Sequence, residues 1–261
     1  MSRTTLVVNC GSSSIKHRLY DEDERELCRG AVEGVGAASG VAWLRVAGGE
    51  KQRQEAAIPD HGDGLRLVCD ALDAAAVIAG DGPSVVAHRV VHGGARFTAP
   101  AVVDDAVLAE LDRLTPLAPL HNPANVLGVR LASERFPRAT HVAVFDTAFH
   151  ATAPDHATRY AVPKRLAIEH GVRRYGFHGA SHAWASRRAA ELLGRPVREL
   201  RTVVLHLGAG ASACAVDCGR SIDTSMGMTP LEGLVMATRS GDLDPGVVLF
   251  LQRELGLSSD E

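Results

Sequence analysis

Apolar residues recur along this chain in two rhythms, one typical of strands and one typical of helices. Residues 4–9 and 15–20 alternate between apolar and polar side chains around a small polar turn, which predicts two paired β-strands. Residues 85–91 and 141–145 are nearly continuous apolar runs, as in buried strands. Further strands and loops are expected over residues 34–50 and helices over residues 63–78, 104–114 and 122–135. Asn122 is expected to be the N-cap of the last helix. This order of elements indicates an α/β fold.

The second part of the chain again combines hairpins with helices. Strands are predicted over residues 203–207, 211–217 and 221–223, and helices over residues 181–193 and 246–255. Residues 7–13 and 203–212 share the order strand, glycine turn, strand. Two such hairpins in two α/β halves would make a duplicated fold with a cleft between the halves. The stretch from Ala151 to Pro154 is predicted to be a linker, so the expected domains are residues 1–150 and 151–261.

Composition and charge narrow the class of protein. The chain of 261 residues is 46% hydrophobic and 23% charged, which is ordinary for a globular protein of one or two domains. Its formal net charge of −3 gives no basic surface for nucleic acid. No apolar run reaches the ~18 residues that a membrane-spanning helix needs. The five cysteines are scattered without a C-x-x-C pair, and we interpret them as reduced thiols of a cytoplasmic protein.

The turn of the first hairpin carries the first candidate chemistry. Residues 9–16 read Asn-Cys-Gly-Ser-Ser-Ser-Ile-Lys. Small residues expose backbone N–H groups and hydroxyls that can hold phosphate oxygens, and Asn9 can hold a hydrated Mg²⁺. The stretch is not a Walker A loop, because that motif has a second glycine followed by Lys and opens a helix. The hairpin therefore points away from the P-loop families.

Two charged residues lie in the predicted central strands. Arg89 is followed by Gly93 and Gly94, and it is either an edge-strand arginine with its head group in solvent or a clamp for a carboxylate or phosphate. Asp146 ends an apolar strand, where ligands of α/β folds gather. It is either a turn or capping residue, or a general base or orienting group.

Further candidates lie in the second part of the chain. His178 and His182 have the i, i+4 spacing of a zinc protease, but Gly179 stands where that motif needs Glu. A histidine just before a helix is better placed to bind an anion. The glycine turn at residues 206–210 can cradle phosphates or be an ordinary hairpin, and Arg239 lies in a polar loop. Together these groups suit phosphoryl transfer, which depends on positioned positive charge.

Several dense motifs run from end to end of the chain in the order of a known family. They are residues 9–16, 88–94 (His-Arg-Val-Val-His-Gly-Gly), 119–123 (Pro-Leu-His-Asn-Pro), 145–150 (Phe-Asp-Thr-Ala-Phe-His), 175–179 (Tyr-Gly-Phe-His-Gly), 206–212 (His-Leu-Gly-Ala-Gly-Ala-Ser) and 223–227 through 242–245. On these motifs the chain resembles the acetokinase family. The resemblance implies duplicated actin-like (ribonuclease H-like) α/β domains. It also implies a cytoplasmic phosphotransferase that reversibly makes acetyl phosphate and ADP from acetate and ATP, with Mg²⁺ or Mn²⁺.

The resemblance implies which residues would handle the nucleotide. Asn9 would help to place Mg²⁺, and Lys16 would contact the phosphates of ATP. The second hairpin would cradle the nucleotide through His206, Leu207, Gly208, Ala209 and Gly210. His178 and Arg239 would stabilise the charge on the phosphoryl group in flight.

The resemblance also implies an acetate site. Arg89 would bind the carboxylate. Asp146 would orient the attacking oxygen rather than deprotonate it, because a carboxylate is already ionised at neutral pH. The pocket for the methyl group would be walled by Val91, Leu120, Phe177 and Pro230.

Two departures from the family bear on these expectations. Ala209 stands where the family usually has Asn, and acetokinases are considerably longer. The second domain is therefore expected to be incomplete and to lack the pocket for adenosine. The alternatives are a kinase that is active once the rest is supplied, a truncated non-catalytic remnant, a propionate-preferring kinase and a nucleotide-binding scaffold. The expected partners are acetate, ATP, ADP, acetyl phosphate and, with the remaining part present, a second copy in a homodimer; neither nucleic acid nor membrane is expected.

Overall fold

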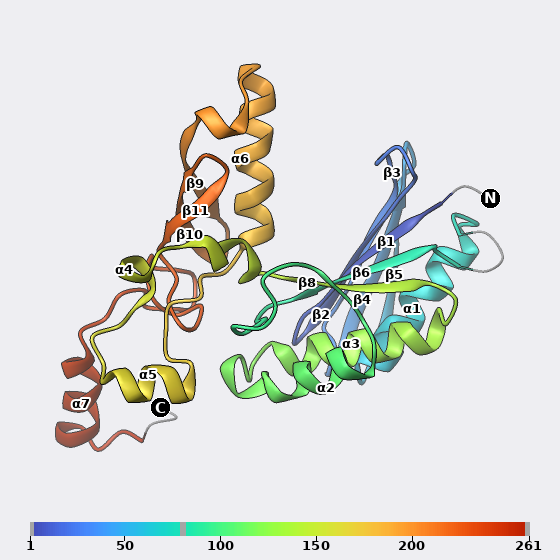
Figure 1. Ribbon diagram of the computed structural model, residues 1–261. Helices are drawn as coiled ribbons and strands as arrows, with labels where there is room; N and C mark the ends of the chain where they lie inside the picture. The colour runs from blue at the N-terminus through green and yellow to red at the C-terminus, as the bar shows by residue number, and fades with distance from the viewer. Residues whose placement is uncertain (1–2, 79–81, 259–261) are drawn as a thin grey trace. The chain divides into compact units, whose positions relative to one another are not determined.

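The chain divides into two compact units, Met1–Ala148 and Phe149–Glu261. The computed structural model in Figure 1 describes residues 3–78 and 82–258. The sequence placed the boundary two residues later, after residue 150.

An eight-stranded sheet forms the first unit, in the order β5-β4-β3-β2-β1-β6-β8-β7. Its strands are β1 (Thr5–Cys10), β2 (Ser14–Tyr20), β3 (Glu26–Glu33), β4 (Ala37–Val46), β5 (Lys51–Ile58), β6 (Val85–Val90), β7 (Ala101–Val102) and β8 (Thr140–Phe145). Strands β1 to β5 form an antiparallel meander. Strands β1, β6 and β8 run parallel to one another, and β7 runs antiparallel to β8. The carboxyl ends of the three parallel strands therefore meet at one edge.

Helices cover one side of this sheet (Figure 1). They are α1 (His61–Ala74), α2 (Asp105–Arg113), the 3₁₀ turn η1 (Thr115–Leu117) and α3 (Asn122–Arg135). The alternating burial of β1 and β2 turns side chains such as Leu6, Val8 and Leu19 toward these helices. Burying this apolar row is the main force that holds the layers together. The predicted first hairpin is confirmed, with β1 and β2 paired antiparallel.

Two sequence expectations for the first unit were wrong in detail. The helix expected over residues 63–78 ends at Ala74, although Val77 and Ile78 continue the apolar pattern. The chain leaves the helix through Ala76, which has φ 51°. The N–H of Ala76 then donates to Asp73 and the N–H of Val77 to Leu72, the pairing that closes a helix end. Strands β3, β5 and β7 were not predicted; β5 is an edge strand whose side chains are mostly exposed, and β7 has two residues.

The second unit contains a three-stranded antiparallel sheet in the order β11-β10-β9. The strands are β9 (Arg201–Leu207), β10 (Ala211–Asp217) and β11 (Arg220–Thr224), which confirms the predicted meander. The helices and 3₁₀ turns that follow Phe145 are η2 (Ala148–Thr152), α4 (Asp155–Thr158), α5 (Lys164–His170), α6 (Gly179–Leu193), η3 (Val197–Glu199) and α7 (Pro245–Glu254). Helix α6 packs against β9.

The stretch from Ala151 to Pro154 is not a free linker. Residues up to Thr152 belong to η2. The hydroxyl of Thr152 donates to the carbonyl of Ser221 at 2.9 Å, which attaches the segment to β11. The small residues of this stretch favoured a linker in the sequence. A 3₁₀ turn is too short to show helical periodicity, so no pattern argued against that interpretation.

Most of the cysteine side chains are inaccessible. Cys10, Cys28, Cys69 and Cys214 are buried, and Cys218 is exposed. Burial raises the pKa of Cys10 to about 12 and that of the other three buried thiols to about 11. Within the described part of the chain, no helix is both long and apolar enough to cross a lipid bilayer.

Candidate active site

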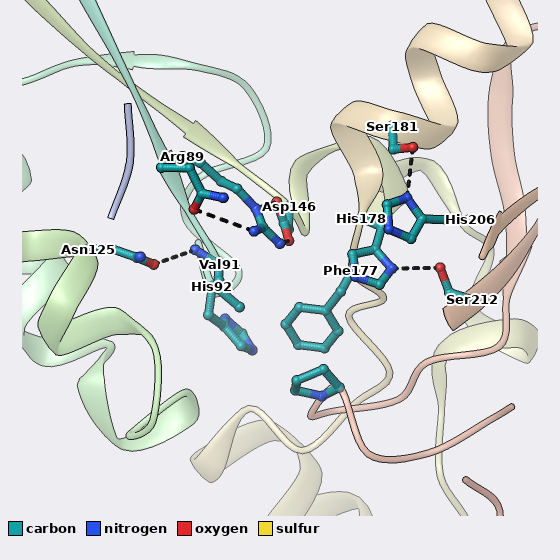
Figure 2. A network of polar contacts seen from close by, with 12 residues as sticks. Arg89, Val91, His92, Asn125, Asp146, Phe177, His178, Ser181, His206 and Ser212 are labelled. Atoms are coloured by element: carbon teal, nitrogen blue, oxygen red, sulfur yellow. Dashed lines mark hydrogen bonds and ion pairs between the residues drawn. The ribbon is translucent and has the colours of Figure 1, made fainter. Parts of the chain in front are cut away.

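Arg89 and Asp146 form a two-pronged ion pair at the edge where the parallel strands of the first unit end (Figure 2). Arg89 lies on β6, and Asp146 directly follows its neighbour β8. The Nε of Arg89 donates to one carboxylate oxygen at 2.9 Å and its Nη2 to the other at 2.6 Å. Burial disfavours the charged guanidinium, but the charge and hydrogen bonds of Asp146 outweigh this and raise the pKa of Arg89. The pair is a preformed ion pair with one exposed partner, since the side chain of Arg89 is 38% exposed and that of Asp146 3%.

The remaining edge of the Arg89 guanidinium lies beside Asn9. Its Nη1 is 3.5 Å from Oδ1 of Asn9. Asn9 and Lys16 are directly opposite each other in the first hairpin, so their side chains share one face of the sheet. A carboxylate could therefore accept from Nη1 and Nη2 of Arg89 while Nε and Nη2 keep their bonds to Asp146.

Asn9 offers one oxygen ligand to a divalent metal ion, which is fewer than a metal held by the protein alone requires. Asn9 contributes a single amide oxygen, and both carboxylate oxygens of Asp146 accept hydrogen bonds from Arg89. Among residues 3–78 and 82–258, no group of three or more His, Cys, Asp or Glu side chains could hold a metal. This donor set fits a Mg²⁺ that takes most of its oxygen ligands from nucleotide phosphates and water.

Side-chain amides of α3 hold the loop that follows Arg89. The N–H of Val91 donates to Oδ1 of Asn125 at 2.9 Å (Figure 2). Nδ2 of Asn125 donates to the carbonyl of Cys10 at 2.6 Å. Asn122 bonds the N–H and the carbonyl of His92. Asn122 is therefore not the N-cap that its position before Pro123 suggested: the side chain is used in this tertiary contact, and His121 is the N-cap.

Thr147 completes this support by accepting from the N–H of Gly93 at 3.1 Å. The sequence did not point to Asn125 or Thr147 as functional residues. The available signal was the position of two buried amides, Asn122 and Asn125, three residues apart on one helix. Such spacing puts both side chains on the same helix face.

Replacing Asn125 with Ala is expected to destabilise the first unit by about 2–4 kcal/mol, because a buried N–H and a buried carbonyl each lose a partner. Urea unfolding followed by the fluorescence of Trp43, in a Trp184→Phe background, measures this. Ser133→Ala on the same helix is the control and should change stability by less than about 0.5 kcal/mol, since its hydroxyl donates to the carbonyl of Val129 within the helix. Equal effects of the two changes would contradict the bridging role of Asn125.

A second group of candidates converges in the second unit. His178 is the N-cap of α6 in the left-handed conformation, with φ 59° and ψ 22°. That conformation costs a residue with a side chain ~1–2 kcal/mol and is concentrated at functional sites. A Cβ on Gly210 would lie 3.5 Å from Nε2 of His178 and 3.7 Å from Nη1 of Arg239. The glycine turn, the imidazole and the guanidinium therefore face one small volume that suits an anion.

The surrounding contacts fix this second group. Arg239 donates from Nη1 to the carbonyl of Pro230 at 2.9 Å. The N–H of Gly208 donates to the carbonyl of Gly210 at 3.0 Å, which closes the turn. The ring of His206 stacks on that of His178 with centroids 4.0 Å apart, and its Nδ1 lies 2.9 Å from Oγ of Ser181 (Figure 2). His206 thus supports His178, while Leu207 is 71% exposed and Ala209 brings only a methyl group.

The four expected wall residues belong to different units. Val91 is buried and Leu120 is exposed, both in the first unit. Phe177 is buried in the second unit, where its carbonyl accepts from Nε2 of His150 at 2.9 Å, and Pro230 bonds Arg239. Each unit thus contributes an apolar residue next to its charged cluster.

Similarity to known proteins decides the family. The sequence model described as the Acetokinase family matches residues 4–261. The chain belongs to the acetokinase family. An acetate kinase of Leifsonia xyli subsp. xyli is 55% identical to this chain, over 98% of the chain and 65% of its own length. The chain thus spans about two thirds of the length of the curated relatives that it matches.

Similar solved structures confirm the α/β fold of the chain. The acetate kinase of Porphyromonas gingivalis matches 99% of the chain and 66% of its own chain, with 42% identity and a TM-score of 0.90. A propionate kinase from Francisella tularensis subsp. tularensis matches the same shares, with 37% identity and a TM-score of 0.92. The expected duplicated actin-like arrangement is consistent with these matches.

Proposed function

We propose that the protein transfers the γ-phosphoryl group of ATP to the carboxylate of acetate, giving acetyl phosphate and ADP. Membership of the acetokinase family and the names of the similar proteins support this reaction. The observation that carries the proposal is the Arg89–Asp146 pair, which leaves the Nη1–Nη2 edge of the guanidinium for a second carboxylate.

Arg89 binds acetate through this edge, and Asp146 keeps the guanidinium in place. One acetate oxygen attacks the γ-phosphorus, and the bond from phosphorus to the bridging oxygen of ADP breaks and leaves its electron pair on ADP. The nucleophile is already ionised, so the step needs no general base. This fits Asp146 as an orienting group, since both of its oxygens are bonded to Arg89.

The second cluster binds and stabilises the phosphoryl group. His178 and Arg239 place a hydrogen-bond donor and a positive charge where the equatorial oxygens accumulate charge. The turn of His206, Leu207, Gly208, Ala209 and Gly210 cradles the nucleotide, with Lys16 on its phosphates. Asn9 and the phosphates of ATP would hold a Mg²⁺, which would supply positive charge to offset the negative charge of the transition state. A cytoplasmic homodimer is part of this proposal on family grounds.

Propionate is the second candidate substrate, because a propionate kinase is among the similar structures. One additional methylene changes binding in an apolar pocket by only ~1–3 kcal/mol. Val91, Leu120, Phe177 and Pro230 are the residues that would set this preference. We expect propionate to be phosphorylated with a kcat/KM roughly 10–200-fold below that of acetate.

The experiment joins this chain to the part of the Leifsonia relative that it does not match, and compares this chimera with the 261-residue chain. Acetyl phosphate is trapped as the hydroxamate after incubation with ATP, Mg²⁺ and acetate. The chimera should form it, and propionyl hydroxamate should appear more slowly. The complete Leifsonia protein is the positive control.

The outcome for the chain alone separates the remaining alternatives. If the chimera turns over and the 261-residue chain does not, the chain is part of a kinase that needs the remaining segment for activity. A chimera that binds ATP without making hydroxamate would support a scaffold or a non-catalytic remnant and contradict the proposed reaction.

A further inference from the structure

Two histidines one helical turn apart on α6 reach the same serine hydroxyl. Nδ1 of His178 is 2.9 Å from Oγ of Ser212, and Nε2 of His182 is 2.8 Å from the same atom (Figure 2 shows the first contact). Both His182 and Ser212 have an exposed fraction of 0%. The two histidines whose i, i+4 spacing resembled a zinc motif in the sequence therefore both contact the hydroxyl of Ser212 on β10.

This geometry links the protonation of the two rings. A serine hydroxyl has one proton and two lone pairs, so Ser212 can donate to only one of the two histidines; it either donates to one and accepts from the other, or accepts from both. If Ser212 donates to Nδ1 of His178, the neutral His178 ring carries its proton on Nε2, and His182 donates from its Nε2. If the direction is reversed, or if Ser212 accepts from both rings, the proton of neutral His178 is on Nδ1 and its Nε2 is a bare acceptor.

The surroundings of His178 select the first arrangement. Its Nε2 and the Nη1 of Arg239 lie beside the same glycine, Gly210. Arg239 thus brings a fixed positive charge to the side of Gly210 that His178 also faces. The other rings nearby are histidines as well: His206 stacks on His178 at 4.0 Å, and His150 meets His182 edge-on at 5.6 Å. An anion beside Gly210 requires a donor, which a neutral ring supplies only as the Nε2–H tautomer.

We propose that Ser212 and His182 are positioning residues that hold His178 as the neutral Nε2–H tautomer, with this N–H directed at the transferred phosphoryl group. The tautomer itself depends only on contacts within the second unit. Its use in phosphoryl transfer rests on the proposed function. The left-handed backbone at His178 fits this assignment, because the strain is offset by a fixed ring position.

Nitrogen NMR of the histidine rings in the 261-residue chain tests the tautomer without substrate. At neutral pH the His178 ring, assigned with the variant His178→Gln, should show a protonated Nε2 and an unprotonated Nδ1. A wild-type ring protonated on Nδ1, or on both nitrogens, overturns the proposal whether or not any variant folds.

Variants test the origin of the tautomer. Ser212→Ala and His182→Leu should each cause the loss of the single-tautomer signature, and His182→Gln should preserve it, because the amide can donate to Ser212. Ser186→Ala is the matched control, a buried serine of α6 whose hydroxyl donates to the carbonyl of Ala183. An unchanged His178 signature in folded Ser212→Ala contradicts the relay.

Kinetics of the chimera test the use of this N–H. Ser212→Ala should lower kcat by roughly fivefold, the equivalent of one net hydrogen bond, and leave the KM for acetate unchanged. A normal kcat in Ser212→Ala overturns the catalytic part of the inference. If the chimera is inactive while NMR finds the Nε2–H tautomer, the proposed function fails and the positioning of His178 stands.

Discussion

Replacing Arg89 with Ala is expected to raise the KM for acetate by roughly 10–100-fold, because a charged hydrogen-bonded contact contributes about 1.5–3 kcal/mol. The acetate would lose both donors of the Nη1–Nη2 edge. The measurement is hydroxamate formation by the chimera over a range of acetate concentrations. ATP is saturating, so that the change in KM is assigned to the carboxylate.

Two further variants sharpen this prediction. Arg89→Lys keeps the charge but lacks the planar fork, so it should recover only part of the affinity. Arg18→Ala is the control, because Arg18 is an exposed residue of β2 paired with Glu26, and its loss should leave the KM unchanged. An unchanged KM in Arg89→Ala would remove this residue from the acetate site. In Arg89→Ala the carboxylate of Asp146, which is 3% exposed, loses its ion-pair partner. Thermal unfolding of this variant checks that the unpaired charge has not disrupted the fold.

Acid is expected to destabilise the first unit through two buried histidines. Burial lowers the pKa of His17 to about 4, and burial together with His141 lowers the pKa of His88 to about 3. Between the ordinary value of about 6.5 and these values, the unfolded chain binds protons that the folded unit does not. Stability is therefore full above pH ~6.5 and falls as the pH drops, by on the order of 3 kcal/mol for His17 by pH ~4. His88 extends the loss to lower pH.

His17→Phe isolates one part of this effect. Neither ring nitrogen of His17 has a hydrogen-bond partner in the described part of the chain, and the ring lies over Gly30. A phenyl ring should therefore raise stability at neutral pH and reduce the loss between pH 6.5 and 4. Urea titrations read by Trp43 in the Trp184→Phe background measure this. His170→Phe, at an exposed histidine of α5, is the control. If the free energy of unfolding depends on pH equally in the wild type and in His17→Phe, His17 does not contribute to the loss of stability in acid.

Much of the fold could be predicted because alternation records which face of a strand is buried. The hairpins of β1–β2 and β9–β10 follow from that rule. Strand β5 does not, since an edge strand exposed on both faces has no alternation to read. The end of α1 was missed because Ala76 adopts a left-handed conformation that favours glycine, and alanine gives no such signal.

In the candidate site, too, the sequence predicted individual residues but not the long-range contacts between them. The sequence singled out Arg89 and Asp146 separately, but their contact depends on the parallel pairing of β6 and β8, which is a long-range property. Asn122 was interpreted as a helix cap because local spacing favours caps, whereas its side chain bonds a loop 30 residues away. Ser212 was part of a recognised motif, yet its link to two histidines depends on how α6 lies against the sheet.

The burial of the cysteines gives this protein a natural attachment point for a spectroscopic label. Thiol-reactive dyes must reach the sulfur atom, and the four buried thiols are inaccessible. Cys218, between β10 and β11, is exposed. A fluorophore or spin label should therefore attach there in the wild-type chain, without removal of other cysteines, and report on the unit that contains His178 and Arg239.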